Sequence, residues 1–486
     1  MDRSRLLFAL TGVAATAVSC GPKQPVPTTP NIVFILADDL GWGDLGCYGQ
    51  QRFTTPNIDA LARDGIRFTQ CYSGTTVSAP SRSCLITGTH SGHTAVRGNL
   101  ELAPEGQFPL PAGAETIFHD LQAAGYRTGA FGKWGLGFVG STGDPAAQGV
   151  DHFFGFNCQL LAHSYYPDHL WDNGQRIELE DNCDAVPYGE GTYAPDLIHA
   201  KALEFLEEAA AEGKPFFLWY PTTIPHAELI VPEDTLIGRF RGRYPETPYR
   251  GIDSGPFFRR GGYVSQAYPR ATFAAMVTRL DTYVGQLIEK LKELGLDGNT
   301  VIIFSSDNGP HREGGADPDF FDSNGPWRGY KRDVYEGGIR VPMIISWPGH
   351  LARGKETDFL CSFWDMMPTL RELTGIAPHE GLDGVSLLPL LQGRKGQREH
   401  DYLYFEFQEL GGRQAVRQGP WKLVHLNVRQ EDASWELYNL EEDPGETTDV
   451  AAQYPGKVAQ LKALMQEAHV PNPDFPLLRE EWENRD

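Results

Sequence analysis

Short apolar runs recur along the chain, and each ends abruptly in polar residues. Residues 32–37 (IVFILA) lead into a pair of aspartates, residues 216–220 (FFLWY) lead into a polar loop, and residues 301–304 (VIIF) precede "SSDNG". Continuous apolar runs of this length are typical of strands that are buried on both faces. We therefore expect these runs to be core strands.

Amphipathic stretches separate the apolar runs. Leu280, Val284, Leu287, Leu291 and Leu294 are spaced by four and three residues, which is the pattern of a helix with one apolar face. Two further helical stretches end at Gly125 and Gly213, and glycine is a common C-terminal stop. Alternating helices and buried strands predict an α/β fold: a largely parallel central sheet covered by helices on both faces.

The pattern changes after about residue 375. Residues 401–427 and 434–450 read as short antiparallel strands with turns, and residues 454–470 read as a terminal helix. A chain of 486 residues also exceeds the size at which a single core stops growing. We expect a large domain over 31–375 and a smaller C-terminal α+β subdomain over 376–486.

The N-terminus has the composition of an export signal. Residues 1–19 combine two arginines with an apolar run that is too short to span a bilayer. The small residue before Cys20 resembles a bacterial lipobox, although Ala17 stands where leucine is usual. We expect a lipidated Cys20, a Pro-rich tether over 20–30, and an exported bacterial protein that is periplasmic or lipid-anchored; a simple signal peptide with a soluble product is the alternative. Cys158 and Cys183 are candidates for a disulfide that sequence cannot decide.

The charge balance limits the partners. The net charge is −22, which disfavours nucleic acid and anionic membrane surfaces, so membrane contact is expected only through a lipid anchor. An anionic substrate would need a locally basic pocket within this acidic chain.

Polar residues at the strand ends suggest where that pocket lies. In parallel sheets, ligands bind beyond the carboxyl ends of the strands, so side chains at these ends should converge on one rim. Carboxylate and amide oxygens favour Ca²⁺, with Mg²⁺ as a second possibility. The side chains expected on this rim are Asp38, Asp39, Lys133, His226, Asp307 and Asn308.

The stretch "VSAPSRSCLITG" at 77–88 reads as a helix with Ser78 as N-cap, proline in its first turn and Gly88 as its stop. A helix N-terminus favours anions, and Arg82 lies one turn after Ser78, which should bring its guanidinium back toward the hydroxyl. The turn is suited to hold an anion against an oxygen nucleophile. An ordinary capped helix is the alternative.

With these residues in view, the chain resembles the type I sulfatases. "SAPSRSCLITG" matches the family signature, in which the leading Cys or Ser is converted to formylglycine, and "ADDLGWGD", "GKWGLG", "SDNGPH" and "GYKRDVYEGGIRVP" look like its other blocks in the same order. The resemblance covers most of residues 31–450. It implies the fold of the alkaline phosphatase superfamily and hydrolysis of a sulfate monoester.

The resemblance also implies a role for each matching residue. Ser78 would become formylglycine, whose hydrate is the nucleophile, through a maturation enzyme acting on the 78–88 segment. Ca²⁺ would be held by Asp38, Asp39, Asp307, Asn308 and residue 78. Arg82 would neutralise the hydroxyl of residue 78. The sulfate would be gripped by Lys133, His226 and Lys331, with His226 or Lys331 protonating the leaving alcohol and His311 lining the pocket.

One position departs from the family pattern, because many relatives have histidine where this chain has Gly135. We expect His93 to be the substitute, with Arg97 beside it; a purely structural role for this loop is the alternative. The histidine- and aromatic-rich residues 156–174, with His163, are expected to contact a sulfated saccharide of galactose type. Arg332 and residues 239–269 are expected to wall the pocket.

Two other functions remain open from sequence. One is a phosphomonoester or phosphodiester hydrolase of the same superfamily that uses Ser78 unmodified. The other is a degenerate glycan-binding lipoprotein, which is disfavoured because the nucleophile, the cation ligands and both lysines are all present.

Overall fold

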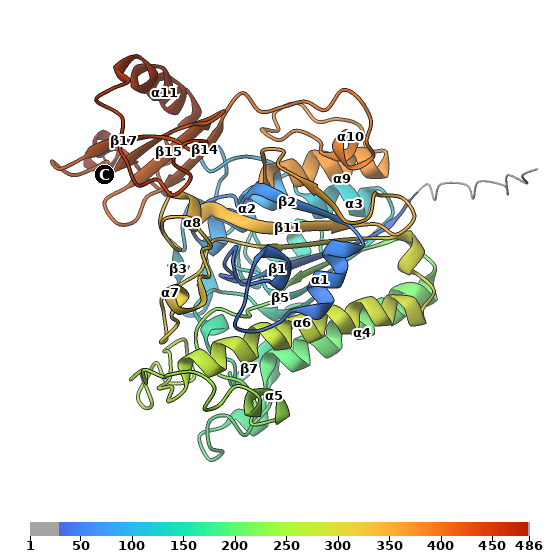
Figure 1. Cartoon of the computed structure of the whole chain (residues 1–486). Helices are drawn as coiled ribbons and strands as arrows, with labels where there is room; N and C mark the ends of the chain where they lie inside the picture. The colour runs from blue at the N-terminus through green and yellow to red at the C-terminus, as the bar shows by residue number, and fades with distance from the viewer. Residues whose placement is uncertain (1–28, 485–486) are drawn as a thin grey trace, which may run out of the picture.

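The computed structural model describes residues 29–484, so the expectations for Cys20 and the segments 1–19 and 20–28 lie outside the described residues. Within this part of the chain, an eleven-stranded sheet runs through the molecule in the order β12-β2-β11-β10-β1-β9-β5-β6-β7-β8, with β13 beside β2 (Figure 1). Its strands are β1 (Asn31–Ala37), β2 (Ile66–Tyr72), β5 (Arg127–Lys133), β6 (His152–Phe156), β7 (His169–Asp172), β8 (Gln175–Glu178), β9 (Phe216–Pro221), β10 (Thr300–Ser306), β11 (Arg340–Ser346), β12 (Lys355–Thr357) and β13 (Cys361–Ser362).

The middle of the sheet is parallel, as the sequence predicts. Strands β10, β1, β9, β5 and β6 run in one direction, while β11, β7 and β8 pair antiparallel near its two edges. Every residue of β1, β9 and β10 is buried. The expected core strands are therefore confirmed, each within two residues of its predicted ends.

Helices cover both faces of the sheet (Figure 1). One face packs against α1 (Pro56–Arg63), α4 (Ala194–Glu212), α5 (Thr235–Gly238) and α6 (Pro269–Glu293). The other packs against α2 (Ser78–Thr87), α3 (Ile117–Ala123), α9 (Met366–Thr374) and α10 (Leu388–Leu391). Side chains of β1 alternate between the two cores: Val33 and Ile35 lie in the first, whereas Ile32 and Phe34 lie in the second.

The C-terminal region forms the smaller α+β unit that the sequence predicts. A four-stranded antiparallel sheet consists of β14 (Leu403–Phe407), β15 (Arg413–Gln418), β16 (Trp421–Leu426) and β17 (Ser434–Asn439), with α11 (Pro455–Ala468) packed against it. Residues before β14 belong to the large core, because Leu387 and Leu391 pack with α9. Helix α12 (Arg479–Glu483) ends the described chain.

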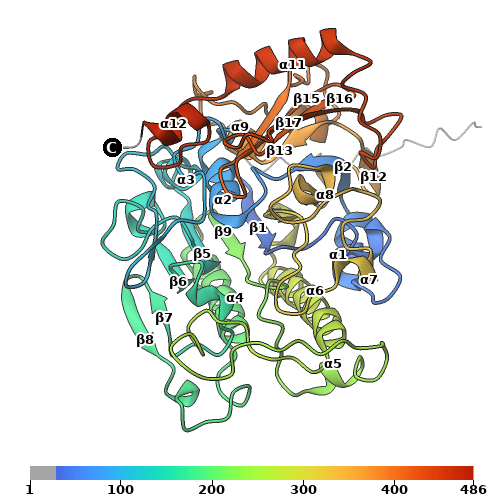
Figure 2. The ribbon, with the colours of Figure 1, turned by 90° about the vertical axis from the view of Figure 1, so that its left-hand side faces the viewer.

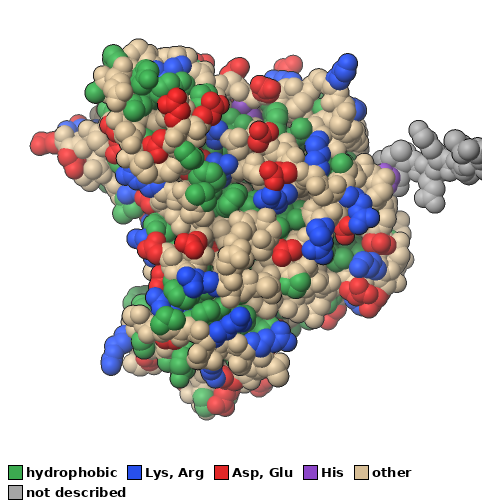
Figure 3. Space-filling view, viewed as in Figure 1, with side chains coloured by type: hydrophobic (Ala, Val, Ile, Leu, Met, Phe, Trp, Pro, Cys, Tyr) green, Lys and Arg blue, Asp and Glu red, His purple; other side chains and the backbone are tan. Residues whose placement is uncertain are grey.

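The remaining elements are short. They are β3 (Glu101–Leu102), β4 (Gly106–Gln107), α7 (Pro318–Phe321), α8 (Glu336–Ile339), and 3₁₀ turns at Gly46–Tyr48, Ala146–Gln148, Leu161–His163, Glu180–Asn182, Asp297–Asn299 and Phe363–Asp365. No helix among residues 29–484 combines the length and apolar character needed to cross a bilayer. On the face in Figure 3, acidic and basic side chains are interspersed, so the net negative charge does not form a single acidic patch there.

Candidate active site

The carboxyl ends of four neighbouring parallel strands meet at one rim, as the sequence predicts. Asp39 follows β1 and Asp307 follows β10, and the backbone N–H of Asp39 donates to Asp307 Oδ1 at 3.0 Å. Asn308 Nδ2 donates to Asp39 Oδ1 at 2.6 Å. Figure 2 shows β1, β5 and β9 ending near one another, beside α2. We call the side chains gathered here the rim cluster: Asp38, Asp39, Ser78, Arg82, Lys133, His226, Asp307, Asn308, Glu313 and Lys331.

Ser78 lies inside the first turn of α2 and is not its N-cap, which corrects the sequence-based expectation. The N-cap is Val77, which is extended and makes no side-chain capping bond. The Ser78 hydroxyl is engaged elsewhere: it donates to Asp38 Oδ1 at 3.1 Å and accepts from Lys133 Nζ at 3.2 Å. The expected stop at Gly88 is confirmed, in the left-handed conformation with φ of 68°.

Arg82 ties three elements of the site together. Its Nε and Nη2 both donate to Asp307 Oδ2, at 3.1 and 2.9 Å, and Nη1 donates to the carbonyl of Lys133. A weaker ion pair links Nη2 to Asp38 at 3.6 Å. The fully buried guanidinium therefore fixes α2 to the ends of β5 and β10, while the expected approach to the Ser78 hydroxyl is replaced by these carboxylate contacts.

Lys331 connects three other side chains of the rim cluster. Its Nζ lies 2.8 Å from Asp39 Oδ2, 2.7 Å from His226 Nε2 and 3.0 Å from Glu313 Oε2. Glu313 also pairs with Arg332, so it holds two neighbouring cations. The imidazole of His226 is oriented by a contact from its Nδ1 to the carbonyl of Ala227.

The two lysines of the site have pKa values that move in opposite directions. Burial lowers the pKa of Lys133 even though Asp38 lies beside it. Burial also disfavours charge on Lys331, but Asp39 and Glu313 outweigh it and raise the pKa of Lys331. Burial and the two lysine charges hold the pKa of His226 well below its ordinary value. His226 is therefore neutral, with Nε2 accepting a hydrogen bond from Lys331.

The donor set fits a hard divalent cation. Three carboxylates, of Asp38, Asp39 and Asp307, are at most 1% exposed. They face the charges of Arg82, Lys133 and Lys331, and the charge of Glu313 is matched by Arg332, so the protein charges balance and an anionic substrate would gain little attraction from them alone. Asn308 Oδ1 is buried and has no hydrogen-bond partner in the described chain. A cation held by these oxygens would satisfy that atom and leave the site net positive.

Aromatic rings form one wall of the site. The ring of His226 stacks between those of His163, at 4.7 Å, and His311, at 5.3 Å. Tyr263, from the irregular segment 239–269, lies 5.2 Å from the His163 ring. His311 is held by the carbonyl of Pro225 at 3.1 Å. The expected position of His163, His311 and this segment beside the rim cluster is confirmed.

The space beside Gly135 is filled by Gln159 and not by His93, the residue expected there. A Cβ at residue 135 would lie 2.1 Å from Gln159 Nε2, and the φ of Gly135 is +73°. Gln159 is 3% exposed, and its Nε2 has no hydrogen-bond partner among residues 29–484. Gln159 thus presents an unpaired donor where a side chain at position 135 would stand, two residues beyond Lys133.

His93 and Arg97 lie away from the rim cluster. The expectation that His93, with Arg97 beside it, replaces the histidine that relatives have at position 135 is therefore wrong. His93 Nδ1 contacts the Asp383 carboxylate at 2.9 Å, at the C-terminal end of α2. The ten-residue helix rises about 15 Å from its N-terminus to this end. Arg97 is buried against Glu406 and the carbonyl of Val470, where it joins the C-terminal subdomain to the large domain.

Two residues of the site escaped sequence reasoning. Glu313 lies in the irregular segment after the "SDNGPH" block, where Arg312 precedes it and two glycines follow, so the sequence carries no local signal for it. Gln159 lies in a loop without periodicity, and only the folded chain brings it to Gly135. Cys158 is buried and Cys183 exposed, and both are free thiols, so the candidate disulfide is absent in the described structure.

Comparison with known proteins identifies the class. The sequence matches the sulfatase family over residues 30–376 and the C-terminal region of N-sulphoglucosamine sulphohydrolase over 325–470. It is 33% identical to arylsulfatase A of Homo sapiens, covering 96% of this chain and 90% of that protein. It is 27% identical to the N-acetylglucosamine-6-O-sulfatase of Bacteroides thetaiotaomicron, covering 96% and 90%.

Solved structures of other proteins share the fold of this chain. Ps i-CgsB superposes with a TM-score of 0.76 at 28% identity, covering 94% of this chain and 97% of that one. A phosphonate monoester hydrolase of Agrobacterium radiobacter shares the fold, with a TM-score of 0.61 at 22% identity. The chain belongs to the sulfatase family, with the fold of the alkaline phosphatase superfamily. It is a sulfuric ester hydrolase.

Proposed function

We propose that the protein hydrolyses a sulfate monoester on a carbohydrate, using residue 78 as formylglycine and Ca²⁺, with Mg²⁺ as the second candidate. The observation that carries the proposal is the contact of Ser78 Oγ with both Asp38 and Lys133 at the base of an oxygen-rich cluster. An oxygen nucleophile beside a cation site and a buried ammonium group is suited to attack an anionic ester.

Ca²⁺ would be held by Asp38, Asp39, Asp307, Asn308 and the modified residue 78, and it would supply positive charge that offsets charge developing on the ester. As formylglycine, residue 78 would supply a hydrated aldehyde, in which one hydroxyl attacks sulfur and the other, once deprotonated, releases sulfate. Unmodified serine lacks this second hydroxyl. The "SAPSRSCLITG" segment would be the substrate of a maturation enzyme, which is a required partner.

The sulfate group would be gripped by the two lysines of the rim cluster. Lys133 already contacts residue 78, and Lys331 contacts the neighbouring Asp39. Both ammonium groups are buried, so they act in a region of low dielectric where their charge is felt strongly. Arg82 would hold α2 and the carboxylate of Asp307 in place.

The leaving alcohol of a sugar needs a proton. Lys331 and His226 share one across 2.7 Å, so either could deliver it at that position. Such general acid catalysis typically contributes about 10²- to 10⁴-fold to the rate. The stacked rings of His163 and His311 would keep the imidazole of His226 oriented for this transfer.

A carbohydrate substrate is supported by relatives and by the surface near the site. Two kinds of relative are named N-acetylgalactosamine-6-sulfatase and N-acetylglucosamine-6-O-sulfatase, and the first of these sugars has the galactose configuration that we propose. A cavity of about 800 Å³ adjoins the loop that carries Gln159 and is lined by Trp171, Arg176 and Arg260. An indole ring and guanidinium groups suit a sulfated saccharide.

We also propose where in the cell the protein is located. An exported protein, periplasmic or anchored through lipid at Cys20, would meet extracellular sulfated glycans, and the supporting evidence is the N-terminal sequence alone.

The test is a panel of sulfated mono- and disaccharides, including galactose-type sugars, assayed with protein made with and without a formylglycine-generating enzyme. We expect sulfate release only from matured protein, and none from its Ser78→Ala variant. Equal activity without maturation would contradict the formylglycine assignment. Release of phosphate from phosphate esters by unmodified protein, without sulfate release, would favour the phosphohydrolase alternative.

A further inference from the structure

A second cluster of metal-binding side chains lies outside the rim cluster. His90 and His93 come from the turn that follows α2, and Asp383 comes from the segment after α9. Their ligand atoms all lie within 4.8 Å of one another. Backbone bonds hold the segments together: the N–H of Asp383 donates to the carbonyl of Gly88, and the N–H of His90 donates to the Asp383 carboxylate at 2.8 Å.

The ligand atoms of these side chains lie close together, and the Asp383 carboxylate already bonds to His93 Nδ1 and to the N–H of His90. Nδ1 of His90 accepts the N–H of Gly92 at 3.1 Å, which leaves Nε2 available, and this Nε2 is 3.9 Å from Asp383 Oδ2. Nδ1 of His93 is 2.9 Å from Asp383 Oδ1. Ligands that share a metal at about 2.1 Å are separated by roughly 3 to 4 Å, so the spacing accommodates one ion.

The chemistry of this cluster differs from that of the rim cluster. Two imidazole nitrogens and one carboxylate suit zinc, whereas a set of carboxylate and amide oxygens suits Ca²⁺ or Mg²⁺. The rings of His90 and His93 stack at 4.0 Å, so the more exposed His93 ring has to turn for both nitrogen lone pairs to meet at one ion.

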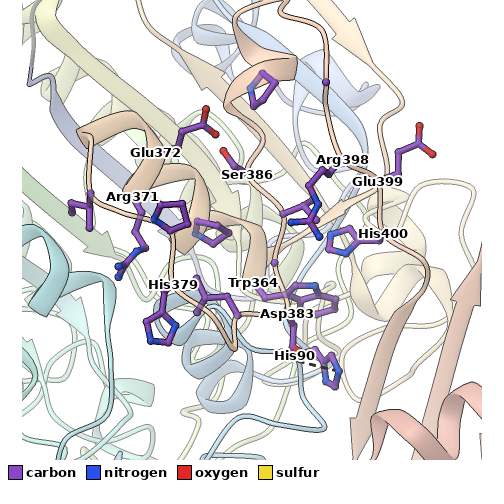
Figure 4. Close-up of a pocket in the computed structure, with 18 of the residues that line it drawn as sticks. His90, Trp364, Arg371, Glu372, His379, Asp383, Ser386, Arg398, Glu399 and His400 are labelled. Carbon is purple, nitrogen blue, oxygen red and sulfur yellow. Dashed lines mark hydrogen bonds and ion pairs between the residues drawn. The ribbon is translucent and has the colours of Figure 1, made fainter.

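The cluster borders a cavity of about 720 Å³ that is separate from the rim cluster. Figure 4 shows His90 and Asp383 next to each other at one end of it, close to Trp364. Trp364 contacts the His90 ring edge-on at 6.0 Å, and His379, Arg371 and His400 lie further along the lining. Three protein ligands leave a coordination position for water or a small ligand, and the cavity gives access to it.

We propose that His90, His93 and Asp383 form a Zn²⁺ site with an open position toward this cavity. The site joins three parts of the chain, because the His90 ring also packs on Tyr404 of β14 at 5.5 Å. Zinc bound there links the turn after α2, the segment after α9 and the C-terminal sheet. Binding to the folded state alone raises the temperature of unfolding.

The experiment titrates Zn²⁺ alone into full-length protein that has been stripped of metal and then saturated with Ca²⁺, which occupies the rim cluster. The variants are His93→Gln and Asp383→Asn. The matched control is His152→Gln, because His152 pairs with Asp172 at 3.1 Å in a similar histidine–carboxylate contact and belongs to no three-residue cluster among residues 29–484. Circular dichroism of the zinc-free proteins checks that each variant folds.

We expect wild type and His152→Gln each to bind one equivalent of zinc. Both cluster variants should bind this zinc at least about tenfold more weakly. Zinc should raise the unfolding temperature of the first two proteins only. Substitution with Co²⁺ should give visible absorption bands that disappear in His93→Gln. Equal zinc affinity and equal Co²⁺ spectra in wild type and both folded cluster variants would overturn the proposal.

Discussion

Lys133 Nζ lies 3.2 Å from Ser78 Oγ, and the same ammonium group contacts the carboxylate of Asp38. The first residue of α2 is therefore held between the end of β5 and the end of β1. A hydroxyl fixed between an ammonium group and a carboxylate has its position and its proton controlled before any substrate arrives.

This relationship predicts a specific response to substitution of residue 78. Ser78→Ala should abolish sulfate release while binding of the sulfated sugar persists, because the gripping cations remain. Kinetic assays and calorimetry with the unreacted sugar measure the two properties separately. Ser78→Cys is the control, since cysteine is the other residue that the family converts to formylglycine, and it should stay active after maturation. A fully active Ser78→Ala would contradict the assignment.

Removal of the divalent cation should inactivate and destabilise the enzyme. Chelation would leave the buried Asn308 Oδ1 without a partner and remove the divalent cation that the three carboxylates would share. At one hundred times its dissociation constant, a bound ion contributes about 2.7 kcal/mol to the free energy of unfolding. Thermal unfolding and activity after chelation, and again after Ca²⁺ is restored, measure the effect. Asp307→Asn should weaken the response to Ca²⁺, and an unchanged response would contradict its role as a ligand.

Gln159 should donate a hydrogen bond during catalysis, from the position that a side chain at residue 135 would occupy. Gln159→Ala should lower kcat by about 10- to 100-fold, the cost of losing one hydrogen bond to a charged group. Gly135→His alone should destabilise the protein, because its Cβ would overlap Gln159 and a φ of +73° strains any side chain there. Combining it with Gln159→Gly removes the overlap but not the backbone strain, so only part of the stability and of the activity should return. Steady-state kinetics and thermal unfolding of the three variants test this. Unchanged kinetics in Gln159→Ala would exclude the role.

Glu313 is a positioning residue for the neighbouring cations. Glu313→Gln should reduce kcat/KM by about tenfold through looser placement of Lys331 and Arg332, because each charged hydrogen bond is worth roughly 1.5 to 3 kcal/mol. The unfolding temperature should fall as well, since the side chain is only 19% exposed and its loss leaves the buried Lys331 with one carboxylate partner fewer, so kcat/KM is compared below the unfolding transition of both proteins. Asp319→Asn, which removes a surface pair with Arg312, is the control and should leave kcat/KM unchanged. Equal kinetics in the two variants would contradict the positioning role.

His169 should make stability depend on pH. Burial opposes its charge, but hydrogen bonds to Asp168 and Glu105 outweigh burial and raise its pKa from 6.5 to about 9. Because the folded-state value lies above the unfolded one, the stabilisation is complete below about pH 6.5 and is lost as pH rises through about 9.

Chemical denaturation of His169→Gln at several pH values measures this contribution. The variant should be less stable than wild type at pH 6 by on the order of 1 kcal/mol, and the difference should vanish near pH 10. His350→Gln is the control for loss of an imidazole that packs on a neighbouring ring, that of Trp347. A constant difference for His169→Gln would refute the prediction.

Much of the fold and the rim cluster follows from sequence because local patterns determine them. Buried parallel strands read as continuous apolar runs, and the residues at the ends of β10, β1, β9 and β5 must meet because these four parallel strands are consecutive in the sheet. The apolar spacing in α6 likewise fixes which face is buried. Family blocks then assign chemistry to positions that periodicity cannot distinguish.

The other features of the site depend on how irregular segments fold back toward the rim cluster, which local sequence patterns do not predict. His93 is close in sequence to Ser78, but the rigid length of α2 carries it to the opposite end of the helix. Gln159 and Glu313 are distant from Ser78 in sequence and reach the site through loops with no periodic signal. The N-cap was misplaced by one residue because the hydroxyl of Ser78 bonds to Asp38 rather than to its own helix.

The most direct test of the account is mass spectrometry of the peptide that contains residue 78, from protein produced together with a formylglycine-generating enzyme and active on a sulfated sugar. We predict a peptide lighter than the serine form by two hydrogen atoms, in a fraction that rises in step with specific activity. Full activity in protein whose residue 78 is entirely unmodified serine would contradict the account.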